Sequence, residues 1–288
     1  MNLLFLCYNG FEKGEDLSLH FAAISPHPPI IIPGIGKAGD LQKVGQTIQA
    51  MRKLANSFQE AEIETLIIIS PHTLVYPDRF NICGMKKLFG TFAHFGSPDI
   101  IMEFPNDLEL ASGIDQLANQ NSIPTLLYNN EGEFFEMDHG LMVPLYYLSR
   151  QQESPLKIIP VAYSNLDRAN HFTFGQIIAE AIAKYPARIG VIASSDLSHR
   201  LIQGAPGGFS EAGKEFDQKI VEDLKNAQTK EIMLYNEEFV EDAGECGYRS
   251  ILILLGILDN LNLKPKILSY EGPFGVGYVV ANYPLGKD

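Results

Sequence analysis

Cysteine is scarce in this chain of 288 residues. The three cysteines, Cys7, Cys83 and Cys246, stand far apart and form no C-x-x-C pair. Disulfide frameworks and structural zinc knuckles both need an even or closely spaced set of thiols. We therefore expect neither of them, and the odd, scattered cysteines favour the reducing environment of the cytoplasm.

Positive charge is also in short supply. The chain has 22 Lys and Arg against 35 Asp and Glu, which gives a formal net charge of −13 at pH 7. Nucleic acids and anionic lipid surfaces are bound through clustered Lys and Arg, and the sequence has no such cluster. We expect no nucleic acid and no membrane among its partners.

Long apolar runs are absent as well. The longest, "ILILLGIL" from residue 251, is far shorter than the ~20 residues that span a bilayer. The first 17 residues begin with a short apolar stretch but lack a basic region and a cleavage site, so we do not interpret them as a signal peptide. We expect residues 1–17 to be an extension that results from a mis-annotated start, with the codon of Leu17 as a non-AUG start. Residues 18–288 are expected to form one domain.

Apolar runs of strand length alternate with stretches of helical periodicity along the chain. Residues 19–24, 63–69, 157–164 and 188–195 resemble buried strands, and residues 40–60, 107–121, 172–185 and 211–226 resemble helices. We expect Asp40 to be the N-cap of the first of these helices. The alternation predicts an α/β fold with a central, mostly parallel or mixed β-sheet covered by helices on both faces.

Histidines follow the predicted strands. His27 lies in "AAISPHPPI" and His72 in "LIIISPHT", each after an apolar run and a Ser-Pro pair, and His199 follows "GVIASSDLS". In open α/β sheets, ligands bind beyond the carboxyl ends of the strands, so we expect these three side chains at one edge. His139, in "EMDHGLMVP", stands between a loop and a helix start, which is also a common position for a site residue.

Two histidines need a third ligand to hold a metal. Residues 238–250, "EFVEDAGECGYRS", offer Glu241, Asp242, Glu245 and Cys246 just before an apolar helix. Acidic residues are equally expected there as the first turn of that helix. Two imidazoles and one carboxylate form the open site of non-haem Fe(II) oxygenases, whereas zinc on the same ligands gives a hydrolase site. The ligand types alone do not choose between these metals.

The chain resembles a known family across almost everything from residue 18 to its end. It is similar to the class III extradiol ring-cleavage dioxygenases, whose catalytic subunit is LigB-like. It is still more similar to the branch with the Memo-type proteins and protein B of the AmmeMemoRadiSam system. The matching segments are "ISPHPPI", "ISPHT", "FGSPDIIMEF", "MDHGLMVPLYYL", "IASSDLSHRL", "GAPGGFSEAGKEFD", "ECGYRSILILLGIL" and "YEGPFGVGYVV".

The resemblance implies metal ligands residue by residue. His27 and His72 match the two metal histidines of the family. Ring-cleaving members have a glutamate as the third ligand, which would be Glu245 here, whereas the Memo branch has a cysteine-glycine pair, which would make Cys246 the ligand. A thiolate is softer than a carboxylate, and it suits Zn²⁺ or Cu as well as Fe²⁺.

The catalytic residues follow in the same way. His199 matches the catalytic base of the family, and an imidazole that titrates near neutral pH is suited to taking a proton from a catechol. His139 matches a position that lines the substrate and oxygen pocket. Asp196 is expected to orient His199 or a metal ligand, or else only to shape the turn after the strand.

The implied function is that of an Fe(II)-dependent extradiol dioxygenase, an oxidoreductase that acts on a small catechol-like aromatic substrate with O₂. The alternative is a Memo-like metal-binding protein without ring-cleavage activity, and a zinc-dependent hydrolase is a third option. A homo-oligomer is left open by the sequence. The glycine-rich loop at residues 203–209 follows His199 and is expected to act as a lid.

Overall fold

The structure is a computed structural model, and it describes residues 18–152 and 154–285. The interpretation of residues 1–17 as an extension lies outside the described residues. The division of the chain at residue 18 therefore stays a prediction.

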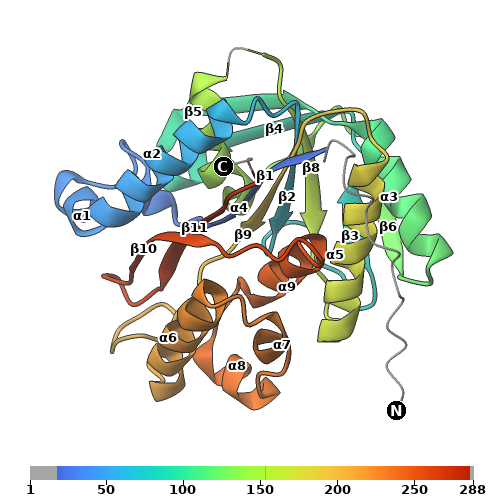
Figure 1. Ribbon diagram of the computed structural model, residues 1–288. Coiled ribbons are helices and arrows are strands. Elements are labelled where there is room, and N and C mark those ends of the chain that lie inside the picture. Colours follow the sequence, from blue (N-terminus) through green and yellow to red (C-terminus); the bar gives the residue numbers. More distant parts are fainter. Residues whose placement is uncertain (1–17, 153, 286–288) are drawn as a thin grey trace.

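An eight-stranded mixed sheet forms the centre of the described part of the chain, in the order β10-β11-β1-β9-β2-β8-β3-β6 (Figure 1). The four adjacent strands β1, β9, β2 and β8 are parallel, β10 and β11 are antiparallel, and β3 runs against β8. Together with the covering helices, this confirms the predicted α/β class. The strands are β1 (Leu19–Ser25), β2 (Thr65–Ser70), β3 (Phe80–Cys83), β6 (Thr125–Tyr128), β8 (Lys157–Ala162), β9 (Ile189–Ser194), β10 (Lys266–Glu271) and β11 (Tyr278–Tyr283).

Helices cover both faces of this sheet and bury two hydrophobic cores. Successive side chains of a strand point to opposite faces, so Ile67 and Ile69 of β2 enter one core while Leu66 and Ile68 enter the other. This explains why the central strands are almost wholly apolar in sequence. The first core is covered by α3 (Leu108–Gln120), α5 (Arg168–Ala183), α6 (Glu211–Lys225) and α9 (Tyr248–Ile257), and the second by α2 (Gly45–Glu60) and α4 (His139–Leu148).

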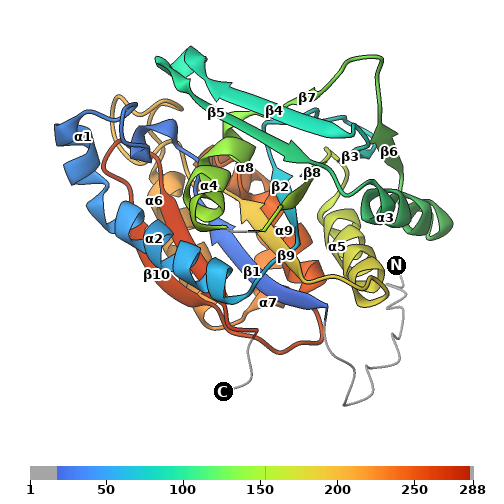
Figure 2. The same cartoon turned by 90° about the horizontal axis from the view of Figure 1, so that it is seen from above.

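A second, smaller sheet was not predicted. In the described residues it contains β5 (Ser97–Pro105), β4 (Lys87–Phe92) and β7 (Phe135–Glu136), in that order. Figure 2 shows this sheet beyond α4, which contacts both β4 and the central strand β2. The half-exposed side chains of β5 lack the continuous apolar character that identifies the central strands.

The expected helix at residues 40–60 is divided in two. A short helix α1 (Ala38–Lys43) precedes α2, and Val44 separates them. The prediction that Asp40 is an N-cap was wrong, because Lys37 occupies that position and Asp40 lies three residues into α1. From there the Asp40 carboxylate accepts a hydrogen bond from the backbone N–H of Lys37, so the residue stabilises the same helix end from inside.

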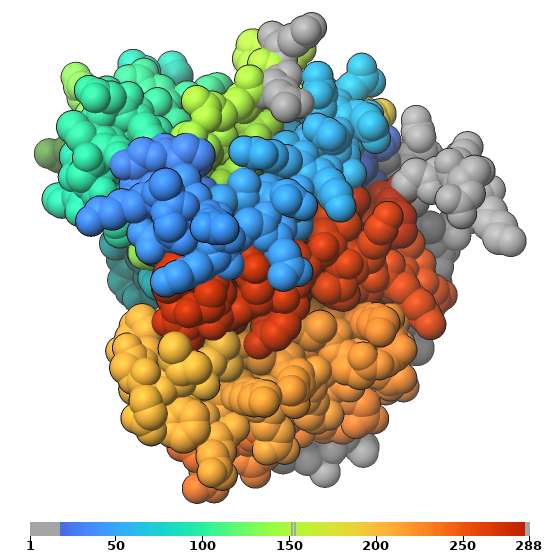
Figure 3. All heavy atoms as spheres, turned by 90° about the vertical axis from the view of Figure 1, so that its left-hand side faces the viewer, coloured from blue at the N-terminus to red at the C-terminus, as the bar shows by residue number. Residues whose placement is uncertain are grey.

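Two short helices, α7 (Thr229–Met233) and α8 (Glu237–Ala243), form a small lobe with α6. In Figure 3 the C-terminal strands, coloured red, lie between this lobe and the N-terminal helices. The contacts of β10 with both α2 and α6 agree with that view. Among the residues that the structure describes, no helix is both long and apolar enough to cross a membrane.

Candidate metal centre

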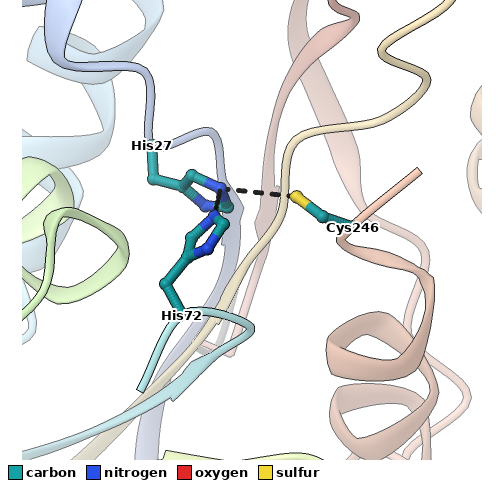
Figure 4. A group of neighbouring side chains, drawn as sticks. All are labelled: His27, His72 and Cys246. Atoms are coloured by element: carbon teal, nitrogen blue, oxygen red, sulfur yellow. Dashed lines mark hydrogen bonds between the residues drawn. The ribbon is translucent and has the colours of Figure 1, made fainter. Parts of the chain in front are cut away.

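His27 and His72 meet beyond the carboxyl ends of β1 and β2, and Cys246 joins them from the segment before α9 (Figure 4). The Nε2 atoms of the two histidines lie 3.1 Å apart, and Cys246 Sγ lies 3.5 Å from His27 Nε2. Nitrogens held about 2.1 Å from one ion in a tetrahedral site are about 3.4 Å apart, and a thiolate about 2.3 Å from that ion lies about 3.6 Å from each of them. All three donor atoms lie within 4.8 Å of one another, so they are close enough to share a single transition-metal ion.

A hydrogen bond to its other ring nitrogen holds His27 in an orientation suited to metal binding. The Ser194 hydroxyl donates to the Gly140 carbonyl at 2.6 Å, so its oxygen is left to accept the His27 Nδ1–H at 2.9 Å. The Nε2 lone pair of His27 consequently faces His72 and Cys246. This arrangement, in which the second ring nitrogen is fixed by a hydrogen bond, is the usual support for a metal-bound histidine.

Both histidines are available as neutral ligands. Burial, followed by the charges of His72, His139 and His199, lowers the pKa of His27 well below its usual value. Burial of the His72 ring, together with His139 and His199, lowers the pKa of His72 to about 4, although the residue presents one side to solvent. Ligation therefore requires no loss of a proton from either imidazole at neutral pH.

Cys246 and Glu245 point in different directions. The Glu245 carboxylate accepts a hydrogen bond from the backbone N–H of Tyr248 and so caps the first turn of α9. Burial raises the pKa of Glu245 to about 7. Glu241 and Asp242, the other two acidic candidates, are exposed on α8. Of the four candidates for a third ligand, the structure brings the Cys246 thiol to the two histidines.

Gly247 allows the Cys246 segment to approach the end of β9. A Cβ at position 247 would overlap the Cβ of Ser195 and would lie 2.8 Å from the carbonyl oxygen of Asp196. The Ser195 hydroxyl donates to the Gly247 carbonyl at 3.2 Å, which fastens the two segments together. A residue with a side chain at position 247 would push Cys246 away from His27.

His139 and His199 border the cluster. The ring centroid of His139 lies 4.2 Å from that of His72 and 5.6 Å from that of His27. Burial lowers the pKa of His199, and its charge is close enough to lower the pKa values of His27 and His72. The structure thus brings together the four histidines that the sequence singled out.

Asp196 lies beside His27. Its Oδ1 accepts a hydrogen bond from the His27 backbone N–H at 2.9 Å, and its Oδ2 is 3.8 Å from His27 Nε2. Burial, with repulsion from Asp217, raises the pKa of Asp196 to about 7. Asp196 was expected to orient either His199 or a metal ligand, and its contacts with His27 favour the second of these roles.

Comparison with known proteins identifies the family. A sequence profile described as "Catalytic LigB subunit of aromatic ring-opening dioxygenase" matches residues 21–281. The chain belongs to the LigB family.

Relatives of this LigB chain divide between a dioxygenase and MEMO1 proteins. It is 34% identical to Protein CA_C1420 of Clostridium acetobutylicum over 92% of its own length, but it spans only 57% of that relative. It is 24% identical to a 3,4-dihydroxyphenylacetate 2,3-dioxygenase of Escherichia coli, covering 73% of this chain and 79% of the relative. It is also 24% identical to a MEMO1 family protein of Methanosarcina mazei, covering 88% and 78% of the two chains.

A solved structure shares the fold of this LigB chain. It is the crystal structure of the uncharacterized protein JW3007 from Escherichia coli K12, with a TM-score of 0.61 and 15% sequence identity. The match covers 91% of this chain and 99% of the other. At that identity the likeness concerns the fold alone.

Two residues at the LigB centre were not anticipated from the sequence. Ser194 supports His27 from the end of β9, and only its place in the same Ser-Ser-Asp segment as Asp196 hinted at a role. Phe95 lies in the short 3-10 helix between β4 and β5 of the unpredicted small sheet, and its ring centroid lies 5.7 Å from that of His139. No local pattern in the sequence indicates that approach, because it depends on how the two sheets pack.

Proposed function

We propose that this LigB-family chain is a metal-dependent oxidoreductase that opens the ring of a small catechol-like aromatic substrate with O₂. The observation that carries the proposal is the presence of two further histidines, His139 and His199, beside the donor set. A site that only stores a metal has no use for unligated acid–base groups at its edge. A bound Fe²⁺ would supply a redox-active Lewis acid with open coordination positions.

His27, His72 and Cys246 are the ligands in this proposal, with Glu245 as the alternative third ligand. Ser194 keeps the His27 ring in its tautomer, and Asp196 holds the backbone of His27. The support for Cys246 is the 3.5 Å distance from its thiol to His27 Nε2. Fe²⁺ is the proposed native metal, and Zn²⁺ or Cu would suit the thiolate equally well.

His199 is the proposed base. Because burial lowers its pKa, the imidazole is neutral at pH 7 and ready to accept a proton from a substrate hydroxyl. His139 is proposed to hydrogen-bond the substrate or oxygen, with the rings of His72 and Phe95 packed beside it. The proposal also includes O₂ and a small aromatic molecule as partners, a cytoplasmic location, and an oligomeric state left open.

A second function is favoured by one observation, the approach of Cys246 instead of Glu245. A thiolate ligand is the pattern that the resemblance assigns to the Memo branch, and several relatives carry the MEMO1 name. In that case the chain binds a metal without cleaving rings. Zinc-dependent hydrolysis remains the third option.

Oxygen uptake separates these functions. The chain is loaded with Fe²⁺ without air, and O₂ consumption is measured with a panel of catechols, beside a His199→Ala variant of matched metal content. We expect uptake and a coloured ring-opened product with at least one catechol, with both reduced by roughly 100-fold or more in the variant. Stoichiometric metal without uptake on any catechol would contradict ring cleavage and favour the Memo-like function.

A further inference from the structure

A buried carboxylate lies beneath the turn that carries His199. Asp217, on α6, is fully buried. Its Oδ1 accepts a hydrogen bond from the backbone N–H of Ser198 at 2.9 Å, and its Oδ2 accepts one from the hydroxyl of Tyr270 at 2.8 Å. Burying a carboxylate without hydrogen-bond donors costs free energy, so these two donors are what make the buried position of Asp217 tolerable.

The N–H that Asp217 binds belongs to the peptide group whose carbonyl contacts His199. His199 Nδ1 lies 3.1 Å from the carbonyl oxygen of Leu197, and the Leu197 carbonyl and the Ser198 N–H are two ends of one peptide unit. A carbonyl oxygen only accepts, so the His199 Nδ1 must carry the proton. The Nε2 lone pair is then left free, which is what a base needs.

We propose that Asp217 is a positioning residue for His199 and acts through the Leu197–Ser198 peptide. The negative charge on the N–H side polarises the peptide and strengthens its carbonyl as an acceptor for Nδ1–H. The arrangement corresponds to a carboxylate–imidazole pair with one peptide group inserted between the two partners. As a statement about catalysis, this inference rests on the proposed function, in which His199 is the base.

The surroundings leave this peptide little freedom to turn. The Leu197 N–H donates to the Gly277 carbonyl at 2.8 Å, and the Gly277 N–H donates to the Ser198 carbonyl at 2.9 Å. A Cβ on Gly277 would overlap the Asp217 carboxylate, so glycine is required there. The Ser198 hydroxyl donates to the Ala243 carbonyl at 2.7 Å. Hydrogen bonds from the groups that flank the Leu197–Ser198 peptide therefore hold it in place, besides its contact with His199.

Three elements supply the groups that face Asp217. Tyr270 comes from β10, which packs against α6 in the lower part of the molecule (Figure 1). Glu245, before α9, repels the Asp217 charge, and Asp217 in turn raises the pKa of Asp196, which follows β9. Burial raises the pKa of Asp217 to about 7, while the bonds from Ser198 and Tyr270 lower it. At pH 8 the group is a carboxylate, and the test is made there.

The test is the tautomer of His199, read from its ¹⁵N signals by NMR in the metal-free full chain at pH 8. We expect the Nδ1–H form in the wild type and a smaller population of that form in Asp217→Asn, because a neutral amide polarises the peptide less. We also expect ring-opening activity to fall roughly tenfold at unchanged metal content. Tyr270→Phe is the matched control. It removes one donor but keeps the carboxylate on the Ser198 N–H, so we expect the wild-type tautomer.

An Nε2–H tautomer in the wild type would overturn the inference, even if Asp217→Asn failed to fold. An unchanged tautomer population in Asp217→Asn would also overturn it. So would the same change in Tyr270→Phe as in Asp217→Asn, because a merely structural role affects both variants alike. If the tautomers are as predicted but the wild type opens no ring, the positioning role of Asp217 is supported and the proposed ring-opening function is contradicted. Failure of the inference and failure of the proposed function are therefore distinguishable.

Discussion

At the scale of single residues, hydrogen-bond partners determine which nitrogen of His27 is free to bind metal. The Ser194 oxygen takes the Nδ1 proton only because its own hydroxyl is committed to Gly140. His27 is almost fully buried, so water cannot replace a missing partner easily. The orientation of this ligand therefore depends on one serine.

Replacing Ser194 tests that dependence. In Ser194→Ala, His27 loses its Nδ1 acceptor, and we expect metal affinity to fall by about 10- to 100-fold. Competition with a chelator measures the affinity. Ser149→Ala is the matched control, because Ser149 bonds the Leu145 carbonyl at the far end of α4. Equal affinities for the wild type and Ser194→Ala would contradict the role given to this serine.

Local sequence patterns identified His27 and His72 as candidate ligands, but they did not decide between Glu245 and Cys246 as the third. Proline and serine before His27 and His72, and apolar runs before those, are local signals of a strand end, and strand ends gather at one edge. Glu245 and Cys246 are adjacent, so no spacing rule separates them. Their directions follow from the first turn of α9, where the Glu245 carboxylate bonds Tyr248 and Cys246 consequently faces the cluster.

At the scale of elements, the position of Cys246 depends on close contact between the start of α9 and the end of β9. In Gly247→Ala the new Cβ meets Ser195, and we expect a loss of about 1–3 kcal/mol in unfolding free energy and a weaker metal site. Urea unfolding and chelator competition measure the two effects. Gly113→Ala on α3 is the control, because nothing lies within 4 Å of its Cβ position. Wild-type behaviour of Gly247→Ala would contradict the packing argument.

A buried histidine outside the candidate site joins the start of α5 to Ser164, which follows β8. The Nε2 of this His171 lies 3.5 Å from the Ser164 backbone nitrogen. His171 Nδ1 lies 2.7 Å from the Asp167 carbonyl, and burial lowers the pKa of His171 to about 4. A folded-state pKa below the unfolded value of 6.5 gives stability that is complete above pH 6.5 and is lost as pH falls toward 4.

We therefore expect the stability difference between the wild type and His171→Gln to shrink by about 1.4 kcal/mol for each pH unit between 6.5 and 4. Denaturant unfolding at several pH values measures it. A difference that stayed constant between pH 7.5 and 5 would contradict the assignment of a neutral, buried His171.

The elements that the sequence revealed are those with a strong period or a continuous apolar run. β2 and β9 are fully buried, and α3 and α6 have one apolar face, so their patterns are plain. The strand β5 is half-exposed and interrupted by charge, and it pairs with β4 as a hairpin whose turn lacks an Asn-Gly or Asp-Gly signal. The break between α1 and α2 falls at Val44, directly before Gly45, and a single glycine is tolerated within helices, so it did not mark the break in the sequence.

At the scale of the whole molecule, residues far apart in sequence form one centre because the parallel strands β1, β9 and β2 end together. His27 and Cys246 are separated by most of the chain, yet their side chains lie 3.5 Å apart. The predicted α/β fold was sufficient to foresee that these histidines would gather at one edge of the sheet. It was not sufficient to foresee that α6, β10 and the segment before α9 would meet beneath His199.

The most direct test of the centre is X-ray absorption at the metal edge of the Fe²⁺-loaded chain, with metal counted per chain. We predict one metal, two nitrogen ligands and one sulfur near 2.3 Å. The sulfur signal should vanish in Cys246→Ser and persist in Glu245→Gln. A wild-type spectrum without sulfur, or a ligand lost in Glu245→Gln instead, would contradict the proposed set of His27, His72 and Cys246.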